Sequence, residues 1–252
     1  MIKQTILITG GTGVLGNQFA KYFAKKDWQV IITSTQKDKA IKFKNSFLEG
    51  KNIEIFICDL TEPEAPFKLL KEVLSRGFKI NHLINNARST SSLAIQDNGT
   101  THRDNFISEY LMHVIVPYEL STCLIELQSE DCKTITNIGS MYGVVAVNPN
   151  LYSENDQPSP IHYGVAKAAC HHLTKELAIR FSENNVRVNC VAFGGVEGRV
   201  NKDFKKRYAK LNPSNRMLLA EEVVGPIDFL IDNKSSSITG HTIVADGGWS
   251  IW

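Results

Sequence analysis

The chain has 252 residues, a formal net charge of +2 at pH 7 and 42% hydrophobic residues, which suits one α/β domain over residues 1–252. The near-balanced charge argues against a nucleic-acid-binding or membrane-surface protein. No apolar run reaches the ~18 residues of a membrane span, and we see no signal peptide. We therefore expect a cytoplasmic protein. The five cysteines are scattered without metal-ligand spacing, and we expect reduced thiols and no bound metal.

The first predicted unit is a strand over residues 3–9, a glycine-rich turn over residues 10–16 and a helix with one apolar face. Glycines allow the backbone to approach phosphate groups closely, and the start of a helix offers free N–H groups to an anion. This pattern predicts a dinucleotide-binding turn; the alternative is a tight turn without a ligand. The cofactor-binding residues expected here are Gly10, Thr12, Gly13, Leu15 and Gly16.

Strand and helix patterns then alternate along the chain. Further strands are predicted over residues 28–33, 53–58, 80–84, 133–138, 186–192 and 242–244. Helices are predicted over residues 39–49, 62–76, 104–127 and 221–231, and in a basic stretch within 193–217. The helix over 62–76 has Pro63 in its first turn. A further helix is predicted from Pro160 onward, with Ser159 as its N-cap. Repeated βα units predict a parallel sheet with helices on both faces and ligands outside the carboxyl ends of the strands.

Tyr163 and Lys167 are four residues apart and share one face of the helix that begins near Pro160. A nearby ammonium group favours the ionised phenol, which can then exchange a proton with a substrate hydroxyl or carbonyl. Ser140 follows the fifth predicted strand, where its hydroxyl could hold a substrate oxygen. The alternative is a Tyr and a Lys on a solvated helix face.

These residues together resemble the short-chain dehydrogenase/reductase family, and the resemblance covers nearly the whole chain. It rests on residues 9–16, 59–60, 85–87, 140, 163–167, 187–191, 238–240 and 246–248. It implies a Rossmann-type doubly wound sheet of seven parallel strands and hydride transfer with a nicotinamide cofactor. By this resemblance Tyr163 is the general acid/base, Lys167 holds the nicotinamide ribose, and Ser140 positions the reacting oxygen.

The same resemblance implies that Asp59 and Leu60 meet the adenine, that Asn86 and Ala87 lie at the ribose region, and that Val196 contacts the cofactor. More narrowly, the sequence looks like dehydrogenases found with bacterial surface-sugar and nonulosonic-acid genes. This likeness rests on residues 140–146, 159–163, 193–196 and 246–249.

Several positions depart from the family pattern. Val14 stands where the common form has glycine, which gives the glycine spacing of longer, sugar-nucleotide-acting relatives. Arg88 replaces a glycine; it is either a solvated loop residue or a charge that points at an anionic substrate. Phe193 and Gly198 replace the usual proline and threonine, which weakens any statement about how the carboxamide is held.

His113 stands where the family has an asparagine whose main-chain carbonyl supports a water-relayed proton path to the lysine. Pro117 lies four residues later and has no N–H to donate to the His113 carbonyl, so the backbone part of that path is expected to survive. We therefore count His113 among the catalytic candidates; the alternative is a packed helix residue beside a proline.

Ser140 and Tyr163 are further apart than usual for the family, because of an insert at residues 147–157 that includes Glu154 and Asp156. We interpret it as a substrate-shaping loop, with an oligomer contact as the alternative. The region 193–217 is expected to act as a lid. Its basic residues from Arg199 to Lys210 form either a solvated face or a contact for a phosphorylated, nucleotide-linked or carboxylated sugar.

The end of the second strand decides the choice of cofactor. NAD enzymes place an acid there, whereas this chain has Ser34, Thr35 and, after Gln36, Lys37. No acid repels a 2′-phosphate, so NADP is preferred over NAD. Lys37 is alternatively only the solvated start of a helix.

The sequence therefore predicts an NAD(P)-dependent oxidoreductase for a small polar substrate, and the narrower likeness indicates a sugar derivative in surface-glycan biosynthesis. Two alternatives stay open: a non-catalytic nucleotide-binding regulator or assembly subunit, and an epimerase or dehydratase with a retained cofactor. We also expect a homodimer or homotetramer, because the helices from Asp104 and Pro160 form the association surface in the family and residues 249–252 offer exposed aromatic rings.

Overall fold

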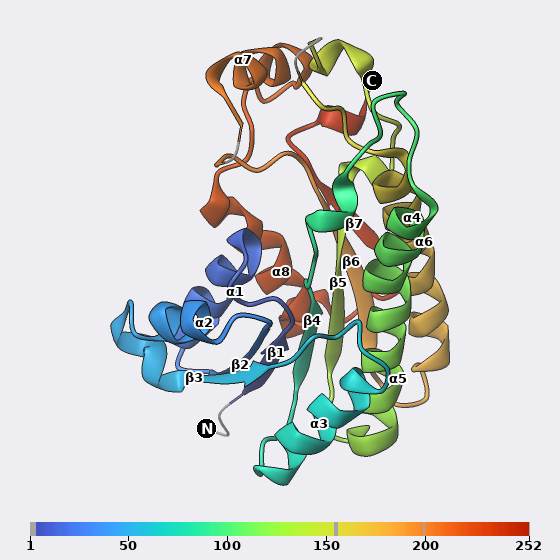
Figure 1. Cartoon of the computed structure of the whole chain (residues 1–252). Coiled ribbons are helices and arrows are strands. Elements are labelled where there is room, and N and C mark those ends of the chain that lie inside the picture. Colours follow the sequence, from blue (N-terminus) through green and yellow to red (C-terminus); the bar gives the residue numbers. More distant parts are fainter. Residues whose placement is uncertain (1–3, 154–155, 199, 252) are drawn as a thin grey trace.

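The computed structural model describes residues 4–153, 156–198 and 200–251; Lys3, Glu154, Arg199 and Trp252, which the sequence analysis used, lie outside them. Within this part, parallel strands form one sheet in the order β3-β2-β1-β4-β5-β6-β7 (Figure 1). The strands are β1 (Thr5–Ile8), β2 (Gln29–Ser34), β3 (Ile53–Ile57), β4 (His82–Asn85), β5 (Thr134–Ser140), β6 (Arg187–Phe193) and β7 (Thr242–Ala245). The predicted seven-stranded Rossmann-type sheet is confirmed.

Helices cover both faces of the sheet (Figure 1). They are α1 (Val14–Lys25), α2 (Lys37–Lys44), α3 (Ala65–Ser75), α4 (Arg103–Tyr110), α5 (Val116–Gln128), α6 (Ile161–Arg180), α7 (Lys202–Leu211) and α8 (Val224–Ile231). In the described part of the chain, no helix combines the length and apolarity needed to cross a membrane.

Two apolar clusters bind these layers to the sheet, and β1 contributes to both. Ile6 and Ile8 pack with Phe19 and Phe23 of α1 and with residues of α8, whereas Leu7 faces α3, α5 and α6 on the other side. Successive side chains of a strand point to opposite faces, so a strand covered on both sides is apolar throughout. This explains why the predicted strands have continuous apolar runs rather than alternating ones.

Several predicted element ends were wrong, for local reasons. Pro160 has an extended backbone (φ −70°, ψ 147°) and precedes α6, which begins at Ile161 without a side-chain cap, so Ser159 does not cap this helix. Pro66 and not Pro63 occupies the first turn of α3. The helix predicted over 39–49 ends at Lys44, and a separate 3₁₀ turn follows at Leu48–Asn52.

The helix predicted over 104–127 is interrupted. A π-helical turn at Leu111–Ile115 separates α4 from α5, and Pro117 lies in the first turn of α5. Proline has no N–H to give to the carbonyl four residues earlier, which is that of His113. Single π turns inside helices are frequent at functional sites, and this one carries His113.

The strand order reverses between β1 and β4, which are neighbours in the sheet although β2 and β3 lie between them in the chain. In open parallel sheets, ligands bind outside the carboxyl ends of the strands at such a switch point. Ser140 is the last residue of β5, not the residue after the strand as predicted, and therefore lies at this edge.

His82 makes the stability of the fold depend on pH. It is buried on β4, with Nδ1 2.8 Å from Thr134 Oγ1 and its ring stacked on Trp28. Burial, together with nearby positive charges, lowers the pKa of His82 from 6.5 to about 3. The unfolded chain therefore binds an extra proton between these two values, and stability is lost as the pH falls through this window.

We expect His82→Gln to reduce the pH dependence of the unfolding free energy between pH 6.5 and pH 4 by up to about 1.4 kcal/mol per pH unit. Urea unfolding at a series of pH values measures this slope. His172→Gln, at an exposed position of α6, is the matched control and should leave the slope unchanged. Equal slopes for the wild type and His82→Gln would contradict the prediction.

Candidate active site

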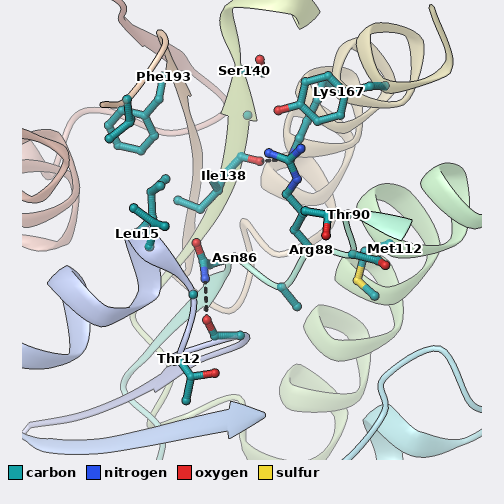
Figure 2. A pocket seen from close by; sticks show the side chains of 18 of the residues that line it. Thr12, Leu15, Asn86, Arg88, Thr90, Met112, Ile138, Ser140, Lys167 and Phe193 are labelled. Atoms are coloured by element: carbon teal, nitrogen blue, oxygen red, sulfur yellow. Dashed lines mark hydrogen bonds between the residues drawn. The ribbon is translucent and has the colours of Figure 1, made fainter. Parts of the chain in front are cut away.

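A cavity of about 660 Å³ opens at the carboxyl edge of the sheet (Figure 2). Most of the sequence-predicted site residues line it: Gly10, Thr12, Gly13, Leu15, Ser34, Thr35, Asp59, Leu60, Asn86, Ala87, Ser140, Tyr163, Lys167 and Val196. Gly16, Lys37 and His113 are not part of this wall. The topology thus brings together residues that are more than 180 positions apart in the chain.

One polar cluster fixes the glycine-rich turn to the end of β4. Thr9 Oγ1 accepts hydrogen bonds from the backbone N–H groups of Asn86 and Ala87, both at 2.8 Å. The Asn86 side-chain amide donates to the carbonyls of Thr9 (2.8 Å) and Gly10 (3.2 Å; Figure 2). Asn86 is therefore a support of the turn as well as part of the cavity wall.

Within the glycine-rich turn, Gly16 lies so close to Gly10 and Asn86 that no side chain fits at position 16. A Cβ on Gly16 would lie 2.4 Å from the Gly10 carbonyl oxygen and 2.8 Å from the Asn86 amide nitrogen. Gly10 has a φ of +64°, which favours glycine. Gly13 is the N-cap of α1 and supplies no side-chain cap, so the first N–H groups of the helix are available to an anion. This cradle fits the pyrophosphate of a dinucleotide.

The wall beside the end of β2 is polar and carries a lysine. Thr12 Oγ1 lies 3.2 Å from Ser34 Oγ, which also accepts from the Gln36 N–H. Lys39 of α2 lines the cavity here. Lys37, the lysine predicted from the sequence, lies two residues earlier and does not line the cavity.

Ser140, Tyr163 and Lys167 line the cavity together, and Figure 2 shows Ser140 and Lys167 at the end away from Thr12. Lys167 is 4% exposed and donates a 2.6 Å hydrogen bond from Nζ to the Ile138 carbonyl, which fixes the ammonium below the ring of Tyr163. Ser140 Oγ accepts from the Tyr142 N–H at 3.2 Å and keeps its own proton free to donate. A half-buried phenol beside a fixed ammonium and a serine hydroxyl suits proton exchange with a substrate oxygen.

Arg88 adds a second positive charge at this end. Its guanidinium carbon lies 5.0 Å from the centroid of the Tyr163 ring, and Figure 2 shows the side chain reaching across the cavity toward Lys167. The guanidinium presents a planar set of N–H donors that match a carboxylate or phosphate. Arg88 is exposed but directed into the cavity, which favours the anion-contact interpretation over that of a solvated loop residue.

His113 lies behind Lys167. Its Nδ1 is 3.2 Å from Lys167 Nζ, so the side chain of His113 contacts the lysine directly. Its Nε2 faces Glu109, a buried carboxylate that the sequence analysis missed. The spacing of four residues between Glu109 and His113 was the available signal.

The described residues of the insert at 147–157 pack against α7. Among its described residues, Leu151 packs with Tyr208 of α7 and with Trp249, and Asp156 pairs with Arg207. The Tyr152 hydroxyl lies 2.9 Å from that of Tyr142, which lines the cavity. No described residue of the insert itself lines the cavity, so any effect on substrate is indirect.

The charges of α7 are largely matched by acids. Lys205 pairs with Glu197 at 2.8 Å, and Lys206 with Asp203 at 3.5 Å. Trp249 is 4% exposed and stacks on Tyr208 with ring centroids 4.5 Å apart. The expectation that Trp249 is an exposed aromatic was wrong. Its ring is buried in a small apolar cluster with Met141, Leu151, Tyr208 and Met217.

The comparisons with known proteins agree with this geometry. The family model for "Enoyl-(Acyl carrier protein) reductase" matches residues 12–250. The 3-oxoacyl-[acyl-carrier-protein] reductase FabG of Buchnera aphidicola subsp. Schizaphis graminum is 30% identical over 98% of this chain and 97% of its own length. Post-translational flagellin modification protein A of Campylobacter coli is 36% identical over 46% of each chain.

Solved structures show the same fold. A short chain dehydrogenase from Leptospira borgpetersenii with bound NAD+ superimposes with a TM-score of 0.86 at 25% identity, covering 98% of this chain and 93% of that one. ElxO with NADP bound gives a TM-score of 0.86 at 25% identity and covers all of both chains. The chain belongs to the short-chain dehydrogenase/reductase family. It is thus an enzyme of a class of NAD(P)-dependent oxidoreductases.

Proposed function

We propose that this enzyme transfers a hydride between NADP and a hydroxyl/carbonyl pair of a polar, negatively charged sugar derivative. The observation that carries the proposal is the convergence of Ser140, Tyr163 and Lys167 in one cavity with Arg88 over the face of the tyrosine. The relative named as a flagellin modification protein supports a role in surface-glycan chemistry, over about half of the chain.

Tyr163, Ser140 and Lys167 have different roles in the proposed reaction. A bound nicotinamide supplies or accepts the hydride. Tyr163 gives a proton to the substrate oxygen during reduction and removes it during oxidation, while Ser140 donates a hydrogen bond to the same oxygen. Lys167 stabilises the phenolate that remains after the proton has left, because its ammonium is fixed on the Ile138 carbonyl.

The glycine turn and the walls beside it hold the cofactor. The N–H groups at the start of α1 bind the pyrophosphate, and Asp59 and Leu60 border the adenine. Asn86 and Ala87 lie at the ribose region, and Val196 borders the nicotinamide end. One cavity joins the glycine turn to the Tyr163 end, which supports this path for a dinucleotide.

A panel of carbonyl compounds, followed by the absorbance of the reduced nicotinamide, tests the substrate class. We expect turnover of carboxylated keto-sugars. Arg88→Met should then raise KM for them about tenfold while changing KM for uncharged keto-sugars no more than about twofold. Equal effects on both groups would contradict an anion contact at Arg88.

Reduction of 3-oxoacyl thioesters is a second candidate, favoured by the full-length match to FabG. Turnover of thioesters but of no sugar would establish it and remove the sugar proposal. Cofactor binding without turnover of either class would support a regulator or assembly subunit. A cofactor that co-purifies and is not consumed would indicate an epimerase or dehydratase.

Lys39 provides a test of the preference for NADP. Lys39 lines the cavity together with Ser34 and Thr35, which supports a contact of its ammonium with a 2′-phosphate, so Lys39→Met should weaken NADPH binding about tenfold and NADH binding no more than about twofold. Lys37→Met, which changes a lysine off the cavity wall, is the matched control. Fluorescence titration gives the dissociation constants. A loss of NADPH affinity in Lys37→Met but not in Lys39→Met would contradict the assignment of Lys39 to the 2′-phosphate.

We infer a homodimer or homotetramer from the outer faces of α4, α5 and α6. Apolar side chains are exposed there, among them Ile107, Tyr118, Ile161 and Val165. A large apolar surface of this kind is usually covered by a partner. Light scattering at micromolar concentration is expected to give an oligomer, and a monomer would contradict the inference.

A further inference from the structure

A row of buried ionisable side chains runs behind the cavity wall. Glu109 at the end of α4, His113 in the π turn and Lys167 in α6 are 0%, 3% and 4% exposed. His113 lies between the other two, with Nε2 3.2 Å from Glu109 Oε2 and Nδ1 3.2 Å from Lys167 Nζ. Buried charges are costly unless they are paired, so this arrangement requires an explanation.

The donors and acceptors fit only one arrangement. A lysine ammonium has donors only, so Nδ1 of His113 must accept from Lys167. The proton of the neutral imidazole is then on Nε2 and faces the carboxylate of Glu109, which has acceptors only. Glu109 Oε1 accepts in turn from Ser92 Oγ at 2.5 Å.

Within the described part of the chain, no other polar group bonds to the two atoms that face each other, His113 Nε2 and Glu109 Oε2. The two atoms approach at an angle outside the usual hydrogen-bond range, and neither has another partner among the described residues. One oxygen of the Glu109 carboxylate therefore faces His113, and the other accepts from Ser92.

The charges around the imidazole keep it neutral. Burial, and next the positive charge of Lys167, lower the pKa of His113 to about 4; Arg88 acts in the same direction and Glu109 opposes it. Burial raises the pKa of Glu109, but the hydrogen bonds from His113 and Ser92 bring it below its usual value. The ring of Tyr163 lies edge-on to His113, with centroids 6.0 Å apart. At neutral pH a neutral imidazole thus joins a carboxylate to an ammonium.

We propose that Glu109 is a positioning residue of this enzyme: it holds His113 in the Nε2–H form, so that Nδ1 fixes the Lys167 ammonium beneath Tyr163 by a direct hydrogen bond. This rests on the proposed function. The direct side-chain link takes the place of the asparagine and water of the related enzymes, and Glu109 is needed only because His113 is present. Carboxylates that orient a histidine in this way are common behind catalytic and metal-bound imidazoles.

A kinetic double-mutant cycle tests the dependence on His113. Glu109→Gln keeps the shape of the side chain and should lower kcat about 10–100-fold, with the dissociation constant of NADPH changed no more than about twofold. In the His113→Asn background, the same change should alter kcat no more than about twofold. Glu126→Gln, at an exposed site on α5, is the matched control.

Ser92→Ala provides a second variant that leaves the carboxylate in place. It should lower kcat in the same direction by a smaller factor, and only when His113 is present. Equal losses for Glu109→Gln with and without His113 would mean a general structural role and overturn the proposal. No loss in either background would overturn it too.

Histidine ¹⁵N NMR of the protein without substrate separates this proposal from the proposed function. The wild type should show His113, assigned with the His113→Asn variant, as the neutral Nε2–H form at pH 7. Glu109→Gln should move its titration midpoint downward, because Glu109 raises the pKa of His113. A Nδ1–H form in the wild type would overturn the proposal even if the enzyme is active, and the Nε2–H form would support it even if no substrate is turned over.

Discussion

Tyr163→Phe is expected to lower kcat about a thousandfold, because the variant has no proton to exchange with the substrate oxygen. Ser140, Arg88 and the ammonium of Lys167 stay in place, so substrate and cofactor should still bind. Stopped-flow absorbance of the reduced nicotinamide measures the loss of turnover. Fluorescence titration with NADPH shows whether the cofactor site is intact.

The matched control for this change is Tyr118→Phe, which removes the same hydroxyl from an exposed position on α5. It should leave kcat unchanged. Turnover by Tyr163→Phe within about tenfold of the wild type would be too small a loss for a removed general acid, and would assign the proton step to another group.

Gly16→Ala is expected to weaken binding of both cofactors about 100-fold, close to 3 kcal/mol. The new Cβ would lie 2.4 Å from the Gly10 carbonyl and 2.8 Å from the Asn86 amide, so the turn must open and its N–H groups move away from the pyrophosphate. Alanine favours helices more than glycine does, so helix propensity cannot be the cause of a loss. Calorimetric titration with NADPH and NADH measures the change.

Gly225→Ala is the control for Gly16→Ala, because a Cβ at Gly225 meets no atom within 4 Å. It should bind both cofactors as the wild type does. Circular dichroism should show that both variants are folded. Wild-type affinity in Gly16→Ala would show that the close approach of the turn is not needed for binding.

The sheet and most of the cavity could be predicted from the sequence because they depend on local patterns. The apolar run of β1, followed after Thr9 by Gly10, predicts a βα turn, and the spacing of Tyr163 and Lys167 places both on one helix face. Parallel topology then brings the carboxyl ends of the strands to one edge. The family resemblance, and not the strand pattern, supplied the grouping of Ser140 with Tyr163 and the cofactor contacts at residues 59–60, 86–87 and 196.

The parts that were missed depend on contacts between distant or irregular segments. Glu109 looks like an ordinary polar residue in a helix until its burial against His113 and Ser92 is known. Lys39 lines the cavity whereas Lys37, the lysine predicted from the sequence, does not, because the exact start of α2 sets which lysine turns inward. Trp249 was expected to be exposed, whereas Tyr208, over forty residues earlier, covers it.

The most direct test of the account is a fluorescence titration of the wild-type protein with NADPH and with NADH. A cavity that joins the glycine turn to Tyr163 and Lys167 predicts saturable binding of one cofactor per chain, tighter for NADPH. Saturation by NADPH that weakens in Lys39→Met would support both the site and the choice of cofactor. Absence of binding by either cofactor would contradict the account, whatever the resemblance of the fold.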